Sequence, residues 1–246
     1  MTILYVNGDS HSAGAEAVNT FAFAEDDPLY WGLGRQPHPD NIKVSYGCEI
    51  ANLMGAVLHC DAESASSNDR IIRTTQDYIN EGNKPDLVII GWSTWEREEW
   101  IRNGASYHVT ASGHDDVPAE LKTRYKEWVI KQAAHENYTP LENLNYDKIW
   151  GFHLELESQN IKHLFFNTYS CFLHKRAYNT DSMDTKNKWF EFSIDPYRQD
   201  MTYYFWLRDN GFNLVNPKWH HYDAEAHKAW ANFILPKVKD VLTLNR

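Results

Sequence analysis

Four short apolar runs, each followed by a helical pattern, constrain the fold of this 246-residue chain more than any other feature. Residues 2–6, 87–90 and 163–167 predict buried parallel strands, because apolar side chains follow one another there without alternation, and a shorter run at 56–59 predicts a fourth. The helical patterns lie at residues 45–54, 68–80, 143–159 and 223–242. Alternation of this kind predicts a doubly wound α/β fold with three layers, α/β/α, around a mainly parallel sheet.

The length of the chain fits one domain that carries insertions. With 42% apolar and 24% charged residues, the composition is that of an ordinary globular protein with one core. Connections in compact domains usually have about 4 to 6 residues, so longer irregular stretches are interpreted as insertions. These stretches cover about residues 13–42, 103–143 and 178–204. We therefore predict a single domain over residues 1–246, with a helical piece at 119–134 inside the second insertion.

Charge, hydropathy and cysteine content exclude several classes of protein. A formal net charge of −10 argues against a surface that tracks nucleic-acid phosphates. No run approaches the length of a membrane span, and the first residues lack the pattern of a signal peptide. The three cysteines have no metal-ligand spacing and suggest reduced thiols. We expect a soluble, cytoplasmic protein with no nucleic-acid or membrane partner.

The first apolar run is followed by Gly8-Asp9-Ser10-His11-Ser12, at the position where candidate chemistry is expected. In an open α/β sheet, ligands bind outside the carboxyl ends of the strands. Gly8 permits a tight turn, and Ser10 would lie at or just before a helix N-terminus, a position that suits an oxyanion. Residue types alone leave two interpretations of Ser10, a nucleophile or a helix N-cap.

Three stretches resemble the sequence blocks of the SGNH (GDSL) hydrolases, a superfamily of esterases and acyl hydrolases with a flavodoxin-like fold. An apolar strand followed by Gly8-Asp9-Ser10 resembles block I, and Pro-Asp-Leu-Val-Ile-Ile-Gly-Trp-Ser at 85–93 resembles block III. Residues 220–231 resemble block V with its following helix. The resemblance implies a serine ester hydrolase that forms an acyl-enzyme on Ser10, with His221 as general base and no cofactor.

The catalytic acid of this family is not matched. Aligning the block V histidine on His221 places Lys218 where the family carries an aspartate. Asp223 could take that role only if the chain bends. Loss of the acid would weaken catalysis, because a third group normally orients the base.

The oxyanion hole is matched only in part. Block III of the family ends in Gly-x-Asn, and Ser93 stands at the place of that asparagine. Residues 62–70 resemble block II, with Ala65 or Ser66 in the place of its glycine. The resemblance implies an oxyanion hole from the amides of Ser10 and Ser66 with the side chain of Ser93 or Asn68, although Asn68 equally suits capping of the next helix.

Several neighbouring residues are candidate substrate contacts. They are Asp9, His11, Trp92, Arg97 and His220. Arg97 would hold a carboxylate or a sugar hydroxyl, or else belongs to a solvated charge cluster at a helix start. The 10 tryptophans favour a carbohydrate O-acyl ester as substrate, and ordinary packing explains them equally well.

Two other interpretations compete with the hydrolase. His220, His221, Asp223 and His227 suggest a metal cluster, but no motif completes a ligand set, so no metal is predicted. The altered acid and oxyanion positions are compatible with a non-catalytic SGNH-fold protein that has a binding or structural role. Ser10-dependent ester hydrolysis distinguishes the two functions.

Overall fold

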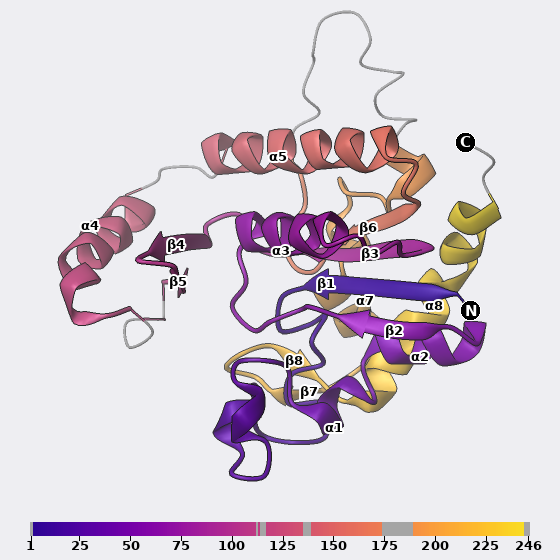
Figure 1. Ribbon diagram of the computed structural model, residues 1–246, viewed down its shortest axis with the longest axis horizontal. Coiled ribbons are helices and arrows are strands. Elements are labelled where there is room, and N and C mark those ends of the chain that lie inside the picture. Colours follow the sequence, from indigo (N-terminus) through magenta and orange to yellow (C-terminus); the bar gives the residue numbers. More distant parts are fainter. Residues whose placement is uncertain (1, 112, 114–116, 135–138, 174–188, 244–246) are drawn as a thin grey trace, which may run out of the picture.

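A parallel four-stranded sheet with the order β2-β1-β3-β6 forms the centre of the structure (Figure 1). The computed structural model describes residues 2–111, 113, 117–134, 139–173 and 189–243. The strands of the main sheet are β1 (Ile3–Gly8), β2 (Val57–Cys60), β3 (Leu87–Trp92) and β6 (His163–Asn167). The helices are α1 (Pro39–Ile42), α2 (Tyr46–Met54), α3 (Asn68–Asn80), α4 (Lys122–Ala133), α5 (Thr139–Ser158), α7 (Tyr203–Asp209) and α8 (Ala224–Thr243). The predicted three-layer α/β fold with a mainly parallel sheet is confirmed.

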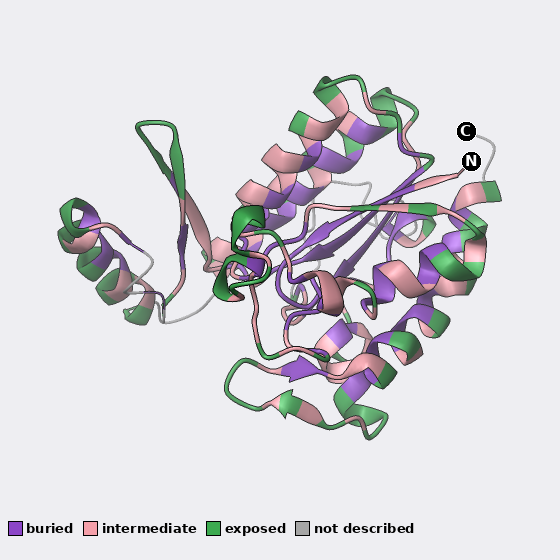
Figure 2. Cartoon of the chain, turned by 60° about the horizontal axis from the view of Figure 1, so that its bottom comes forward, coloured by how far each residue is buried: buried purple, intermediate pink, exposed green. Residues whose placement is uncertain are grey.

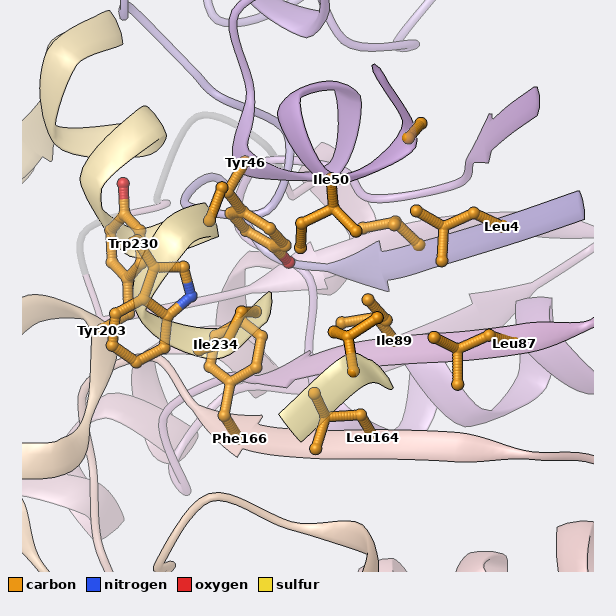
Figure 3. Packing of buried hydrophobic residues seen from close by; sticks show 14 of the residues in the cluster. Leu4, Tyr46, Ile50, Leu87, Ile89, Leu164, Phe166, Tyr203, Trp230 and Ile234 are labelled. Carbon is orange, nitrogen blue, oxygen red and sulfur yellow. The ribbon is translucent and has the colours of Figure 1, made fainter. Parts of the chain in front are cut away.

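Helices cover both faces of this sheet, as Figure 2 shows by the buried strands between them. On one face, alternate side chains of the strands pack against α2, α7 and α8, where Leu4, Ile89, Phe166 and Trp230 are fully buried (Figure 3). On the other face, the remaining strand residues pack against α3 and α5. A strand buried on both faces has no polar alternation, which is why its continuous apolar run was readable in the sequence.

Helix and strand limits agree with the sequence pattern to within a few residues. Helix α3 has the predicted bounds, with Ser67 as its N-cap, so Asn68 is not the cap. The pattern at 143–159 misses the first turn of α5, which begins at Thr139. No helix of the described residues is long and apolar enough to cross a membrane.

A hairpin that the sequence did not predict begins just before the second insertion and continues into it. Strands β4 (Glu98–Arg102) and β5 (Ala105–Val109) pair antiparallel, so the charged cluster around Arg97 begins a strand and not a helix. The hairpin and α4 share a small apolar cluster to one side of the sheet (Figure 1). Of the third insertion, residues 178–188 lie outside the described part of the chain.

Two glycines bring the first and third strands together at their carboxyl ends. The register of β1 and β3 places Gly8 opposite Gly91. A Cβ atom on Gly8 would lie 2.1 Å from the Ser12 hydroxyl oxygen, and one on Gly91 would lie 2.6 Å from it. Only glycine at both positions lets the chain after β1 turn directly across the end of the sheet.

Candidate active site

Ser10 and His221 line one cavity of about 240 Å³, although they are 211 positions apart in the sequence. Ser10 follows β1, and His221 begins β8 (His221–Tyr222), which pairs antiparallel with β7 (Leu214–Asn216). The full lining consists of Ser10, Glu16, Ala22, Phe23, Arg35, Ser64, Ala65, Arg97, Thr110, Gly113, Trp219 and His221. The first two insertions therefore supply much of the wall.

The Nδ1 atom of His221 donates a hydrogen bond to the carboxylate of Glu16. Because a carboxylate only accepts hydrogen bonds, Nδ1 carries the proton and Nε2 is left as an acceptor. The second oxygen of Glu16 accepts a hydrogen bond from Asn216 Nδ2 at 2.8 Å. Burial alone would raise the pKa of Glu16, but the hydrogen bonds from His221 and Asn216 outweigh it and lower that pKa.

The carboxylate that contacts His221 is that of Glu16 and not that of Asp223. Asp223 accepts a hydrogen bond from the amide of Ala226 at 2.9 Å and caps α8. Glu16 lies in the first insertion in the left-handed region, at φ 63°, and nothing in the sequence marked it as a partner of a histidine near the C-terminus. Lys218, aligned with the family acid, lies with its ammonium 4.3 Å from the ring centroid of the half-exposed Trp219.

The side chain of Asn7 links the turn that carries Ser10 to helix α3. This buried side chain accepts a hydrogen bond from the Gly8 amide at 2.8 Å and donates to Thr74 at 2.8 Å and Thr75 at 3.0 Å on α3. The helix expected directly after Ser10 does not form: residues 10–16 are a turn, in which the Ser10 carbonyl accepts a hydrogen bond from the Ala15 amide at 2.9 Å. Within the described residues the Ser10 amide donates to no protein acceptor, so it is available to a ligand.

In the turn between β2 and α3 (residues 61–67), Ala65 and not Ser66 offers a free amide to the cavity. The Ser66 amide donates to the Glu63 carbonyl at 3.1 Å, and its hydroxyl accepts from Arg70. Ala65 lines the cavity at φ 67°, a conformation that suits glycine and costs an alanine roughly 1 to 2 kcal/mol. The predicted oxyanion donor therefore shifts by one residue.

The two side chains predicted to complete the oxyanion hole form hydrogen bonds with other protein groups. Asn68 accepts from the Ser93 amide at 2.8 Å and donates to Asn145 Oδ1 at 2.8 Å. The hydroxyl of Ser93 accepts from Arg97 at 2.9 Å. Neither Asn68 nor Ser93 lines the cavity, and both instead fix the chain at the end of β3.

The buried Asp9 and the partly exposed Arg97 form an ion pair next to Ser10 in the structure. The Nη1 atom of Arg97 lies 3.3 Å from Asp9 Oδ2, which also accepts from the Thr168 hydroxyl at 3.1 Å. Asp9 is 1% exposed, whereas Arg97 reaches the cavity wall. Of the predicted substrate contacts, Arg97 thus lies at the cavity and Asp9 lies behind it.

The other histidines near His221 serve packing. His11 is buried, its ring lies edge-on to that of His221 with centroids 5.7 Å apart, and burial lowers its pKa to about 4. His227 is buried against Tyr46 and Tyr203, and burial lowers its pKa to about 3. His11 and His227 are therefore neutral near pH 7 and would not oppose a positive charge on His221.

Neither the metal interpretation nor two of the predicted substrate contacts agrees with the geometry. The ring of His220 stacks on Tyr169, with centroids 5.7 Å apart, and does not line the cavity. Trp92 is 1% exposed and packs edge-on against Phe165 in the core. No group of three potential ligands within the described ranges is arranged to hold a metal ion.

A larger hollow of about 690 Å³ beside β2 lacks comparable chemistry. Its thiol, Cys60, is a poor nucleophile because burial raises its pKa to about 12. The smaller cavity at Ser10 is therefore the candidate active site.

Glu63, in the β2–α3 turn, contacts residues of the first and the second insertion. Its carboxylate accepts from Arg35 of the first insertion at 3.0 Å, lies 3.1 Å from His108 Nε2 of β5, and forms a short ion pair with Arg70 of α3. His108 also donates from Nδ1 to the Ser64 carbonyl at 3.1 Å. Burial alone would raise the pKa of Glu63, but His108 and the arginines outweigh it and lower that pKa to about 2.

We expect Glu63 to make the protein acid-sensitive. Its pKa is about 2 in the folded chain and 4.5 in the reference state, so its stabilisation is complete above the reference pKa and is lost as the pH falls towards 2. That shift corresponds to about 3 kcal/mol. When the free energy of unfolding is measured by urea titration at several pH values from 7 to 2, it should fall less for Glu63→Gln than for the wild type. Parallel declines, or the same flattening for exposed Glu81→Gln, would contradict this role.

Comparison with known proteins finds distant structural likeness. No family model matches the chain, and no curated protein sequence matches it. It resembles a protein of the G-D-S-L lipolytic family from Desulfitobacterium hafniense DCB-2, with 13% identity and a TM-score of 0.45 over 96% of this chain and 99% of that one. It also resembles a carbohydrate esterase family 2 enzyme from Corynascus thermopiles (Myceliophthora fergusii), with 13% identity and a TM-score of 0.49 over 99% of this chain and 67% of that one. For the acetyl xylan esterase AlAXEase the values are 12% identity and a TM-score of 0.46, over 97% of this chain and 100% of that one.

Proposed function

We propose that this chain is a serine ester hydrolase that forms an acyl-enzyme on Ser10. One observation carries the proposal: Ser10 lines the same cavity as a histidine whose Nδ1 donates to a partly buried carboxylate. A serine hydroxyl is a weak nucleophile until a base within reach removes its proton, and the base works best when a third group fixes its tautomer. Ser10, His221 and Glu16 supply these three groups.

In the proposed reaction, the Ser10 oxygen attacks the ester carbonyl carbon while His221 Nε2 takes the hydroxyl proton. Glu16 stabilises the resulting imidazolium. His221 then returns the proton to the leaving alcohol, and water activated by the same histidine hydrolyses the acyl-enzyme. Within the described residues, no hydrogen bond joins Ser10 to His221, and such contacts often close only when substrate binds.

The oxyanion of the tetrahedral intermediate would be held by the amides of Ser10 and Ala65. Both residues line the cavity, and neither amide donates to a described protein acceptor. A donor of this kind typically contributes about 3 to 4 kcal/mol to transition-state stabilisation. Two backbone amides reduce the need for the family asparagine, which this chain lacks.

A carbohydrate ester remains the favoured substrate class within this proposal. Phe23 and Trp219 line the cavity, and Trp219 is 43% exposed, so an aromatic face is available for stacking on a sugar ring. The non-catalytic alternative was motivated by the altered acid and oxyanion positions. The Glu16–His221 contact and the free amides of Ser10 and Ala65 favour the hydrolase over it.

The proposal is tested by measuring hydrolysis of p-nitrophenyl acetate and labelling by a fluorophosphonate probe. Wild-type protein should turn over and label, and His221→Ala should lower kcat/KM by about a thousandfold or more. His220→Ala, which alters an adjacent histidine outside the cavity lining, should stay within a few-fold of the wild type. Activity that survives in His221→Ala but not in His220→Ala would show that another base acts. Absence of labelling and turnover on a panel of short esters would favour a binding protein.

A further inference from the structure

We propose that the site recognises a carboxylate group on its substrate through Arg97. The inference rests on the proposed function and narrows its substrate to an ester that carries an acidic group near the scissile bond. The observation behind it is that one nitrogen of the Arg97 guanidinium binds protein groups, whereas the other two have no partner in the described structure.

Arg97 is anchored through a single nitrogen. Its Nη1 donates to the Ser93 hydroxyl at 2.9 Å and to Asp9 Oδ2 at 3.3 Å. A guanidinium has five N–H donors, two of them on Nη1. Among the described residues, Nε and Nη2 of Arg97 have no protein partner, although the side chain lines the cavity and is only 22% exposed. Three donors of a fixed, planar cation are therefore free beside Ser10.

The charges around the cavity favour an anionic ligand. The lining contains two arginines and one carboxylate, Glu16, in a chain whose net charge is −10. Glu16 is fully engaged by His221 and Asn216. Arg35 is engaged as well, because its Nε donates to Glu63 and its guanidinium lies 4.1 Å from the ring centroid of Phe23. Nη1 of Arg35 also lies 3.6 Å from the carboxylate of Glu25. Among the described residues, Arg97 has Asp9 as its one acidic partner, so it is the better placed of the two arginines to bind an anion.

A second unsatisfied donor lies in the same wall. The hydroxyl of Ser64 is buried without a hydrogen-bond partner, and the residue is 8% exposed. Burial of a hydroxyl without a partner is costly, and such groups are often satisfied by a bound molecule. Ser64 and Arg97 both line the cavity with Ser10, so one small ligand would reach all three.

A carboxylate fits these donors better than a neutral group does. Arginine binds carboxylates through two parallel N–H···O bonds, and such charge-assisted bonds are about twice as strong as neutral ones. Lysine cannot reproduce that planar fork. Because the cavity measures about 240 Å³, the ester should be small, with its carboxylate on the acyl side or the alcohol side.

The experiment compares matched acidic and neutral esters by pH-stat titration. Monoethyl succinate against ethyl butyrate tests a carboxylate on the acyl side, and O-acetyl-lactate against isopropyl acetate tests one on the alcohol side. We expect wild-type kcat/KM to favour the acidic member of one pair by about tenfold to a hundredfold. Arg97→Lys, which keeps a positive charge beside Asp9, should lose this preference because kcat/KM falls far more for the acidic ester than for the neutral one. Arg102→Met, at an exposed arginine of the hairpin, should leave the preference unchanged.

Two kinetic outcomes would overturn the inference. Equal, measurable rates for acidic and neutral esters in both pairs would do so, as would an equal loss on both members in Arg97→Lys, which would indicate a general role at the oxyanion. Calorimetric titration of Ser10→Ala protein with both members of each pair separates this inference from the hydrolase proposal. Binding of an acidic ester that disappears in Ser10→Ala/Arg97→Lys would support carboxylate recognition even if no ester is hydrolysed, and the absence of binding by both acidic esters would reject it.

Discussion

Replacing Ser10 by alanine is expected to lower kcat/KM for short esters by about 10⁴-fold or more and to abolish fluorophosphonate labelling. The hydroxyl oxygen is the atom that the proposed reaction acylates. Stability should stay close to that of the wild type, because no hydrogen bond of the described structure uses the Ser10 side chain. Initial rates, labelling and thermal unfolding together measure these effects.

Ser12 provides a matched control in the same turn. Its hydroxyl is buried and accepts a hydrogen bond from the Tyr46 hydroxyl at 2.8 Å. Ser12→Ala should therefore lose about 1 kcal/mol of stability and still be labelled at Ser10. If Ser12→Ala lost labelling and Ser10→Ala kept it, the nucleophile would be misassigned.

Replacing Glu16 by glutamine is expected to lower kcat about 10³- to 10⁴-fold, an effect second only to loss of the nucleophile. The amide has nearly the same shape as the carboxylate, but it carries no charge to stabilise the imidazolium of His221. Its NH₂ group can also donate to Nδ1 and favour the wrong tautomer. Steady-state kinetics on p-nitrophenyl acetate, with circular dichroism to check folding, measure the change.

Asp223→Asn is the control that separates the two candidate acids. Asp223 caps α8 through the Ala226 amide, and asparagine is as good a cap as aspartate. This variant should keep near wild-type stability and activity. A large loss of kcat in Asp223→Asn together with normal activity in Glu16→Gln would show that the Glu16–His221 pair is not catalytic.

The fold was largely readable from the sequence, because strands buried on both faces leave continuous apolar runs. The same apolar runs led to one wrong prediction, because they did not show where β3 ends. Trp92 was expected near the substrate, yet β3 continues through Trp92 and its ring is 1% exposed. The run 87–90 showed that the strand exists but not where it ends, since strand ends depend on the neighbouring strands.

The parts of the candidate site that follow a strand were also readable. Gly8 and Ser10 lie where a tight turn after a buried strand brings a side chain to the end of the sheet. His221 was a candidate because residues 220–231 resemble block V of the family. The sequence therefore indicated individual candidate residues at the ends of elements.

Only the tertiary structure decided which groups complete the site. Glu16 and His221 are 205 positions apart, and their contact depends on a left-handed residue in the first insertion and on the β7–β8 hairpin. Whether the amide of Ala65 or of Ser66 is free depends on one hydrogen bond to the Glu63 carbonyl. Local sequence patterns report periodicity and burial along one element, whereas these contacts are set by how irregular segments fold onto the sheet.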